Sequence, residues 1–345
     1  MNQLLKELTE IPGVSGDEKA VRKAIRDLIE PHVDEWSVDP MGNLIALKKG
    51  TGESDLRVMI DAHMDEVGFL ITDVMTDGTF KFSTVGGFDE RILQGKVLQV
   101  GPKNITGVIG GKPVHLSSAA ERRKTVPVSS LRIDIGASSK DSARGKVKVG
   151  QYATFLTEYT ELDDIAIGKA FDDRAGCAVI IELLRGKPFP FDLYASFTVQ
   201  EEVGLRGAHV AAAIIKPDVA FIIDCTPAYD LPNEFDESPN VALGHGPAIY
   251  LMDRATIQDP RLVSYLMRTA EDNDIRFQLR KPGGGGTNTA SVQRSGPGAV
   301  SATVSLPGRY MHGPNSMINL NDYDQTIKLL DTALRNFTEE IIVRN

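Results

Sequence analysis

The feature that most constrains the fold is a change in the pattern of apolar residues part-way along the chain. From Val67 to Ala166, short runs rich in β-branched and aromatic residues follow one another between glycines and polar clusters; these runs are FKFSTV, KVLQV, ITGVIG, LRIDI and KVKV. Closely spaced short strands are typical of a small barrel or sandwich. The flanking segments alternate single apolar strands with amphipathic helices, which indicates an α/β sheet. The sequence therefore predicts one α/β domain, residues 1–66 and 167–345, interrupted by a β-rich insert, residues 67–166.

The elements of the α/β segments can be placed by pattern. We expect strands at LRVMID, LYASFTV, DVAFIID and AVSATVSL, and a helix at RAGCAVIIELLR. Ser15 and Glu18 have the spacing of a capping box before a helix, and Asp259-Pro260 opens another. The closing helix is predicted from an apolar spacing of three and four residues that runs from Ile327 to Ile341. Within the insert only LSSAAERRK reads as briefly helical.

Composition excludes some functions. The formal charge is −9 and no run of lysines and arginines is present, which argues against a nucleic acid or an anionic membrane as partner. The opening MNQLLKELTEIPG has neither the basic nor the apolar region of a signal peptide, and no apolar run approaches the roughly 18 residues of a transmembrane helix. Cys177 and Cys225 both lie in apolar segments, so we expect no disulfide framework and a cytoplasmic location.

Acidic residues and two histidines recur where strands are expected to end. His63 and Asp65 follow LRVMID, and Glu201 and Glu202 follow LYASFTV. The remaining members of this set are Asp224 at the end of DVAFIID, His312 after the last strand, and Asp172 with Asp173 at the start of a helix. In open α/β sheets ligands bind beyond the carboxyl ends of the strands. If the strands are mainly parallel, these side chains converge on one rim.

Two imidazoles among several carboxylates suit zinc, cobalt or manganese and do not suit calcium. One zinc ion takes about four donors, and this set is large enough for two ions with a bridging carboxylate. Cations would neutralise the adjacent pair Glu201 and Glu202. Only one of them need be a ligand, so the other is free to act as a base.

Each residue also has a purely structural interpretation. His63 and Asp65 can form a hydrogen-bonded surface pair, two adjacent glutamates can begin a solvated helix, and two aspartates suit a helix N-terminus. Their joint occurrence at strand ends favours a common site. The glycine run 283–286 is not followed by Gly-Lys-Ser/Thr, so it does not indicate a phosphate loop; a flexible loop that approaches a ligand closely is the better interpretation.

The chain resembles one family over nearly its whole length. The segments that carry the resemblance are GVSGDE, DAHMDEVGF, GVIGGKPVHL, AFDDRAGC, TVQEEVGLRGA, AFIIDCTPA, LGHGPAI, GGGGTNTAS and LPGRYMHGPNSMINL. They are similar to the TET-type cocatalytic dinuclear-metal aminopeptidases, which include glutamyl and deblocking aminopeptidases and proteins named endoglucanase. The resemblance implies a mixed-sheet dizinc-peptidase domain with an inserted small β-barrel, or PDZ-like, dimerisation domain.

The resemblance also implies residue roles. Asp172 would bridge two divalent ions, His63 and Asp224 would complete one site, and Glu202 and His312 the other. Glu201 would be the general base that deprotonates a metal-bound water, and Asp65 would orient the imidazole of His63. The implied metals are zinc or cobalt, with manganese as an alternative. The implied substrates are short peptides, and the implied assembly is a homo-dodecamer built from dimers.

The substrate remains open. Family members commonly have Gly-Thr-Asp-Ala after the glycine run, where this chain has Asn288 in Gly-Thr-Asn-Thr-Ala, which would remove a charge near the substrate pocket. Arg254, Lys281 and Arg309 could each receive an acidic side chain or could be ordinary surface charges. The rival functions are a metal-dependent N-acyl amino acid deacylase or carboxypeptidase, an endoglucanase, and an assembly in which the metals are structural.

Overall fold

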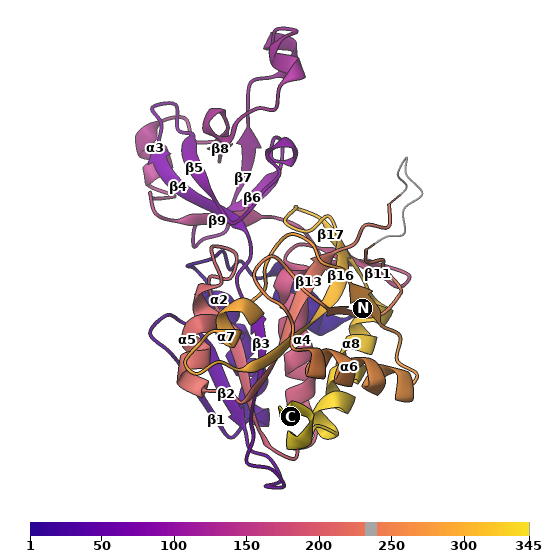
Figure 1. The fold of residues 1–345 in the computed structure, drawn as a ribbon. Helices are drawn as coiled ribbons and strands as arrows, with labels where there is room; N and C mark the ends of the chain where they lie inside the picture. The colour runs from indigo at the N-terminus through magenta and orange to yellow at the C-terminus, as the bar shows by residue number, and fades with distance from the viewer. Residues whose placement is uncertain (232–239, 345) are drawn as a thin grey trace.

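The structure is a computed structural model that describes residues 1–231 and 240–344. It contains a larger α/β domain and a separate barrel that projects from it (Figure 1). The helices are α1 (Gln3–Glu10), α2 (Lys19–Ile29), α3 (Lys140–Arg144), α4 (Phe171–Arg185), α5 (Arg206–Ile215), α6 (Pro260–Asp272), α7 (Thr289–Gln293) and α8 (Leu320–Arg335). No helix in these ranges has the length and hydropathy needed to cross a membrane.

A mixed sheet forms the centre of the α/β domain. Its main path runs β1-β2-β12-β3-β13-β16-β17-β11-β10, and β14 and β15 extend it beside β16. The bounds are β1 (Glu35–Val38), β2 (Leu44–Lys48), β3 (Arg57–His63), β10 (Thr160–Leu162), β11 (Ile165–Gly168), β12 (Asp192–Thr198), β13 (Val219–Pro227), β14 (Ala248–Tyr250), β15 (Gln278–Arg280), β16 (Val300–Arg309) and β17 (Ser316–Asn319). The neighbours β12, β3, β13 and β16 are parallel, so their carboxyl ends share one edge.

Helices cover both faces of the parallel strands, which explains why these strands are apolar throughout. On β3, Val58 and Ile60 belong to the large core that includes α4, whereas Met59 packs in a second cluster with α5 and α7. Figure 1 shows α4, α6 and α8 on one side of the sheet and α5 and α7 on the other. Because both faces are closed, the rim at the strand ends is where polar side chains of the sheet can reach a ligand.

The insert is a closed antiparallel barrel with the strand order β4-β5-β8-β7-β6-β9. Its strands are β4 (Gly68–Val74), β5 (Phe80–Val85), β6 (Val97–Val100), β7 (Ile105–Gly110), β8 (Arg132–Asp134) and β9 (Tyr152–Phe155). Phe69 packs edge-on against Phe82 and Phe155 and stacks on Phe88, which gives the barrel a core of its own. The predicted fold class, an α/β domain with an inserted small β-barrel, is confirmed. The main sheet resumes at Thr160, ahead of residue 167, where we expected the α/β pattern to return.

Three local predictions were wrong. KVKV forms no strand, because Lys146 and Val147 donate their backbone N–H groups to the carbonyl of Ala143 and close the turn after α3. LSSAAERRK is briefly helical as predicted, with a 3₁₀ helix at Glu121–Arg123, but it is not the only helical segment of the insert, because α3 also lies there. The closing helix ends at Arg335, although the apolar spacing continues because Phe337 still packs edge-on against aromatic side chains of the core.

Candidate metal centre

Parallel strands bring most of the candidate residues to one rim. His63 is the last residue of β3, and Glu201 and Glu202 follow β12, which ends at Thr198. His312 follows β16 beyond Arg309. We expected Asp224 to end its strand, but β13 continues to Pro227 because its parallel pairing with β16 extends that far. Asp224 therefore faces the site from within the strand.

The adjacent aspartates at the start of α4 have different environments. Asp172 and Asp173 lack helical backbone angles, and the peptide bond between them is cis. Asp173 is fully buried and caps the helix, because its Oδ1 accepts the N–H of Gly176 at 3.0 Å. A Cβ at Gly176 would lie 2.3 Å from that oxygen, which explains the glycine. Asp172 is left to face the rim.

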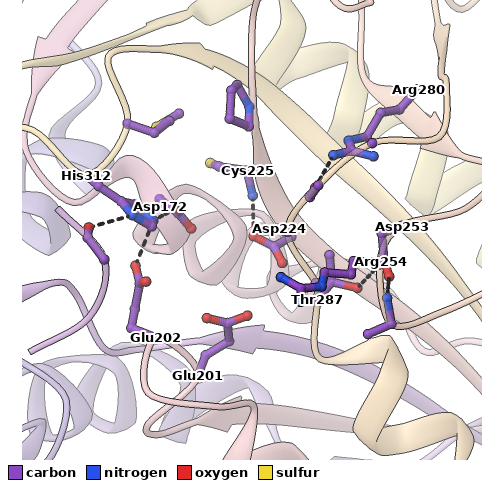
Figure 2. Close-up of a pocket in the computed structure, with 18 of the residues that line it drawn as sticks. Asp172, Glu201, Glu202, Asp224, Cys225, Asp253, Arg254, Arg280, Thr287 and His312 are labelled. Atoms are coloured by element: carbon purple, nitrogen blue, oxygen red, sulfur yellow. Dashed lines mark hydrogen bonds and ion pairs between the residues drawn. The ribbon is translucent and has the colours of Figure 1, made fainter. Parts of the chain in front are cut away.

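The two carboxylate oxygens of Asp172 face different histidines. The Nε2 atom of His63 lies 3.1 Å from Oδ1, and the Nε2 atom of His312 lies 3.3 Å from Oδ2. His63 Nε2 is also 4.0 Å from Asp224 Oδ1. His312 Nε2 is 3.3 Å from Glu202 Oε1, and Figure 2 shows these two side chains beside Asp172. Asp172 therefore lies between two clusters of potential ligands.

Each imidazole is oriented through its other nitrogen. The Nδ1 atom of His312 lies 3.0 Å from the backbone carbonyl of Gly87, which belongs to the barrel. The Nδ1 atom of His63 lies 3.1 Å from the carbonyl of Asp65 and 3.4 Å from its carboxylate. An N–H donated at Nδ1 leaves Nε2 free to bind a cation.

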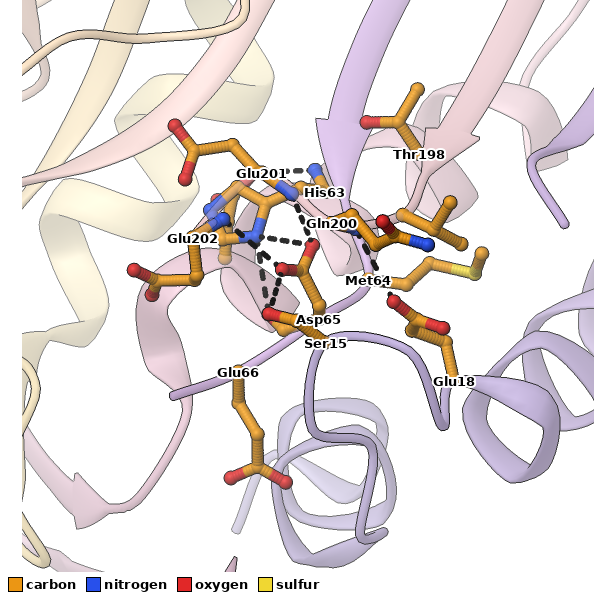
Figure 3. A network of polar contacts seen from close by, with 12 residues as sticks. Ser15, Glu18, His63, Met64, Asp65, Glu66, Thr198, Gln200, Glu201 and Glu202 are labelled. Carbon is orange, nitrogen blue, oxygen red and sulfur yellow. Dashed lines mark hydrogen bonds and ion pairs between the residues drawn. The ribbon is translucent and has the colours of Figure 1, made fainter. Parts of the chain in front are cut away.

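Asp65 is the centre of a polar network at the back of the site (Figure 3). Its fully buried carboxylate accepts the backbone N–H of Glu201 at 3.0 Å, that of Glu202 at 3.1 Å and the hydroxyl of Ser15 at 2.6 Å. Ser15 was expected to cap α2, so this prediction was wrong. Glu18 likewise turns away from a capping box and accepts the backbone N–H groups of Gly16 and Gln200.

Burial controls the protonation of the rim. Burial, together with the neighbouring carboxylates, raises the pKa of both Glu201 and Glu202 to about 8. Burial and the charge of Asp172 hold the pKa of Asp224 well above its ordinary value. Burial also disfavours the charged form of Asp172, but hydrogen bonds from both histidines hold its pKa below the ordinary value. Burial, with repulsion between the carboxylates, thus favours the protonated forms of Glu201, Glu202 and Asp224, whereas Asp172 stays ionised.

The pKa values of both histidines are raised, although burial alone would lower them. Burial lowers an imidazole pKa, but Asp172 and Glu202 outweigh it and raise the pKa of His312 to about 10. Glu201, Asp172 and Asp65 likewise hold the pKa of His63 well above its ordinary value. Within the described residues no lysine or arginine forms an ion pair with these acids. A donor set of this kind fits divalent cations, which would supply the missing positive charge.

Two groups of side chains have potential ligand atoms within 4.8 Å of one another. One contains His63, Glu201 and Asp224, and the other contains His63, Asp172 and Glu202. These groups include Glu201, which we expected to be a base, and omit His312. The Nε2 atom of His312 nevertheless lies 3.3 Å from both Asp172 and Glu202 of the second group. The structure thus brings together all seven expected residues, and the assignment of each to one ion stays a prediction.

Comparison with known proteins decides the family. A model described as M42 glutamyl aminopeptidase matches residues 42–329, and a second, described as AMPT, matches residues 1–23. The chain belongs to the M42 glutamyl aminopeptidase family. It is an aminopeptidase of this metallopeptidase family, as the resemblance implied.

Curated relatives of this M42 aminopeptidase differ in their named substrates. A putative aminopeptidase of Acetivibrio thermocellus is 39% identical over 97% of this chain and 98% of its own length. A lysyl aminopeptidase of Pyrococcus furiosus is 32% identical, with 96% of each chain covered, and a glutamyl aminopeptidase of Lactococcus lactis is 30% identical, with 97% and 96% covered. The family alone therefore leaves the preferred N-terminal residue open.

Solved structures share the fold. A TET aminopeptidase from a thaumarchaeon superimposes with a TM-score of 0.94 at 33% identity, covering 98% of this chain and 97% of that one. A Thermotoga maritima protein named endoglucanase gives 0.81 at 41% identity, with 96% of each covered. The TET1 peptidase of Pyrococcus horikoshii, described as assembling into a tetrahedron or a large octahedral shell, gives 0.86 at 34% identity, with 97% and 99% covered.

A cavity of about 1100 Å³ opens beside the candidate metal centre of this M42 aminopeptidase. Its wall includes the loop 87–89 from the barrel, the glycine run 283–286 and the side chains of Arg254 and Arg280 (Figure 2). Among the arginines and lysines proposed from sequence, Arg254 lines this cavity, whereas Lys281 is exposed outside it and Arg309 forms an ion pair with Asp230. Sequence analysis missed Arg280, whose only local signal is its position near the glycine run.

The segment that contains Asn288 was expected near the substrate pocket, and it does border the cavity through Gly286 and Thr287. The side chain of Asn288 is 2% exposed and does not line the cavity. Its Nδ2 donates to Asp61 Oδ2 at 2.8 Å and to Thr198 Oγ1 at 2.9 Å. Asn288 therefore fastens the end of the glycine-rich loop to β3 and β12, while its neighbour Thr287 lines the cavity.

Proposed function

We propose that this chain is a dinuclear-metal aminopeptidase that removes the N-terminal residue from short peptides. The placement of Asp172 carries this proposal, because its two oxygens face His63 and His312 separately, at 3.1 and 3.3 Å. A carboxylate in this position can bridge two cations. Asp224 would complete the site of His63, and Glu202 that of His312.

Two divalent ions per subunit suit these ligands, with zinc or cobalt as the first choice and manganese as an alternative. Bound there, they would supply Lewis acidity that polarises the scissile carbonyl and lowers the pKa of water. The chain's own contribution is to hold the ligands in place. Asp65 fixes the imidazole of His63 and the backbone of Glu201 and Glu202, and Gly87 fixes the imidazole of His312.

Glu201 is the proposed general base. Its carboxylate lines the cavity, is 9% exposed, and forms no ion pair with a described lysine or arginine. Burial raises its pKa to about 8 in the metal-free protein, and cations bound nearby would lower this pKa, so the carboxylate would be ionised and able to accept a proton near neutral pH. Glu201 would take a proton from the attacking water and deliver it to the leaving amine of the peptide.

The test is release of the N-terminal residue from free and N-acetylated peptides. We expect activity on free peptides only, loss of activity after chelation, and recovery with zinc, cobalt or manganese. Glu201→Gln should lower kcat by about 10²- to 10⁴-fold while the metal content stays at two ions per subunit. Glu202→Gln is the matched variant: it should lose bound metal, measured by mass spectrometry, because Glu202 is a proposed ligand.

Other outcomes would point to the rival functions. Activity on acetylated peptides would indicate a deacylase, and release of the C-terminal residue would indicate a carboxypeptidase. Chelator-insensitive cleavage of a glucan would indicate an endoglucanase, although the chain's only tryptophan, Trp36, lies on the edge strand β1 and not in the cavity. Inactivity with every metal, with the protein folded and metal-loaded, would indicate structural ions.

We also propose that the chain forms a dodecamer built from dimers and works in the cytoplasm. A relative that assembles into a tetrahedron supports the first proposal. So does the exposed apolar pair Val97 and Val108, which are cross-strand neighbours on the barrel. Two buried free thiols, Cys177 and Cys225, support the second. Sedimentation of the wild type and of Val108→Glu tests the assembly, and cell fractionation tests the location.

A further inference from the structure

The two adjacent glutamates of the candidate metal centre face the same way, which an extended chain does not allow. Successive side chains of a β-strand point to opposite faces of the sheet, yet Glu201 and Glu202 both line the cavity. Gln200, immediately before them, has a φ of +57°, in the left-handed region that residues other than glycine rarely adopt. Such a conformation costs about 1–3 kcal/mol and persists only where the surrounding structure enforces it. The backbone after β12 therefore needs contacts that hold it in this shape.

Side-chain oxygens hold four successive backbone N–H groups of this segment. The pairing of β12 with β3 ends at Thr198, so the N–H groups of residues 199–202 need other acceptors. The contacts are Asn43 Oδ1 with Val199 at 2.9 Å, Glu18 Oε1 with Gln200 at 3.2 Å, and the carboxylate of Asp65 with Glu201 and Glu202 at 3.0 and 3.1 Å. Three side chains from different parts of the chain thus fix the backbone that carries both glutamates.

Glu18 is the member of this set that binds the strained residue itself. It is 4% exposed, and the oxygen that accepts the N–H of Gln200 also accepts that of Gly16 at 2.7 Å. Gly16 has a φ of +93°, and a Cβ there would lie 2.7 Å from the hydroxyl of Tyr152 on the barrel. Figure 3 shows the carboxylate of Glu18 directed at the backbone beside Gln200, next to the network of Asp65. The acceptor is therefore itself held in place.

The contact of Glu18 replaces a local role that its position offers. Glu18 is the N-cap residue of α2, but its side chain makes no hydrogen bond to that helix. A side chain that caps a helix typically contributes about 1 kcal/mol. The bond to Gln200 joins residues 182 positions apart in the sequence. Departures from local rules of this kind are expected at functional sites, which favours a role for Glu18 at the site.

We propose that Glu18 is a positioning residue for Glu201, because its hydrogen bond to the backbone of Gln200 directs the proposed base into the cavity. The inference rests on the proposed function, in which Glu201 takes a proton from the attacking water. A base must lie within hydrogen-bond reach of that proton, and a displacement of about 1 Å can cost about 10²-fold in rate. Glu18 does not line the cavity. Loss of its contact should therefore lower kcat and leave KM nearly unchanged.

The test compares the metal-loaded wild type with Glu18→Asp and Glu18→Gln on the p-nitroanilides of glutamate, leucine and lysine. Glu18→Asp keeps the charge on a shorter side chain, whereas Glu18→Gln keeps an oxygen at the same reach without the charge. We expect Glu18→Asp to lower kcat by about 10- to 100-fold with KM and metal content unchanged. Glu18→Gln should stay close to the wild type. Asp17→Asn, which removes the adjacent exposed charge, is the control and should change neither kcat nor KM.

Several outcomes would overturn the inference. Full kcat in Glu18→Asp with a lower melting temperature would show that the contact only stabilises the fold. An active Glu18→Asp beside an inactive Glu18→Gln would show that the charge matters and not the hydrogen bond. Loss of metal from Glu18→Asp would place the effect on Glu202, the proposed ligand, and not on Glu201. A wild type that is inactive on every substrate with every metal would instead refute the proposed function, and the inference with it.

Discussion

At the scale of single residues, two pairs of adjacent acids build the site, Asp172 with Asp173 and Glu201 with Glu202. Asp173 caps α4 and binds the backbone N–H of His63, whereas its neighbour Asp172 faces two imidazoles. Glu201 and Glu202 both face the rim, and their backbone N–H groups share the carboxylate of Asp65. The aspartate pair thus has one side chain that holds the backbone and one that faces the rim, whereas both side chains of the glutamate pair face the rim.

Asn288→Asp should destabilise the protein in a pH-dependent way. Burial raises the pKa of Asp61 to about 6, and Asn288 counteracts this by donating a hydrogen bond. A second buried carboxylate at position 288 would raise the pKa values of both carboxyl groups, its own and that of Asp61, further above those of the unfolded chain. The folded protein would then lose stability as pH rises through these pKa values, because both carboxyl groups must ionise in a buried place. We expect a deficit in the free energy of unfolding of roughly 2–3 kcal/mol at pH 8 and a smaller deficit at pH 5, measured by urea denaturation.

The exposed turn residue Asn104 provides the control, since Asn104→Asp should change stability little at either pH. A deficit for Asn288→Asp of the same size at pH 5 and pH 8 would contradict the role assigned to Asp61.

The residues of the rim could be expected from sequence, but their supports could not. Histidines and carboxylates at predicted strand ends carry a local signal, since the strand and the residue lie in one short segment. Ser15 contacts Asp65 across 50 residues, and Arg280 contacts Thr226 across 54. Their side chains suggest a cap and a surface charge, and only the tertiary fold gives them other partners.

At the scale of elements, the strands of the parallel core were predicted well because they are buried on both faces and so are continuously apolar. The apolar pattern predicted secondary structure less well where a buried side chain belongs to no helix or strand. Val147 is buried in the barrel core, yet it lies in a turn and not in a strand. Phe337 keeps the helical spacing of α8 after the helix has ended.

The junction between barrel and α/β domain contains a buried ion pair that should matter for stability. Lys169 Nζ lies 2.8 Å from both oxygens of Glu66, which also accept the N–H of Gly13 and the hydroxyl of Thr154 from β9. Lys169→Met would leave the buried carboxylate of Glu66 with Arg174, 3.7 Å away, as its only remaining cation among the described residues. We expect a loss of about 3–5 kcal/mol in the free energy of unfolding, measured by chemical denaturation.

A double variant separates the charge from the packing. Adding Glu66→Leu to Lys169→Met should restore part of the stability, because the unpaired carboxylate is then removed, while Arg174 keeps its backbone carbonyl acceptors. Lys112→Met, which removes an exposed ion pair with Glu121, is the control and should leave stability unchanged. If Lys169→Met proves as harmless as this control, the junction does not depend on the pair.

At the scale of the whole molecule, the candidate metal centre should couple stability to both pH and metal. In the metal-free protein, Glu201 and Glu202 have pKa values raised to about 8 and His312 to about 10, so the folded state binds more protons than the unfolded chain between about pH 5 and 9. Its free energy of unfolding should therefore fall as pH rises through this range. Asp172 and Asp65, whose pKa values are lowered, contribute only in more acidic solution.

Added metal should reverse this trend, because its ligands must lose their protons and binding strengthens as pH rises. Denaturation curves recorded from pH 5 to pH 9, with chelator and with zinc, measure both effects. Parallel pH profiles under the two conditions would show that these groups do not bind the metal.

The contact between the carbonyl of Gly87 and His312 has a consequence for protein engineering, because it makes the inserted barrel part of the site. The carbonyl orients His312, and the loop around it forms part of the cavity wall. A chimera that exchanges the barrel between relatives would thus also exchange a piece of the site. A change in how the barrel sits would also move the carbonyl that orients an imidazole of the α/β domain, so the barrel cannot be exchanged without regard to the site.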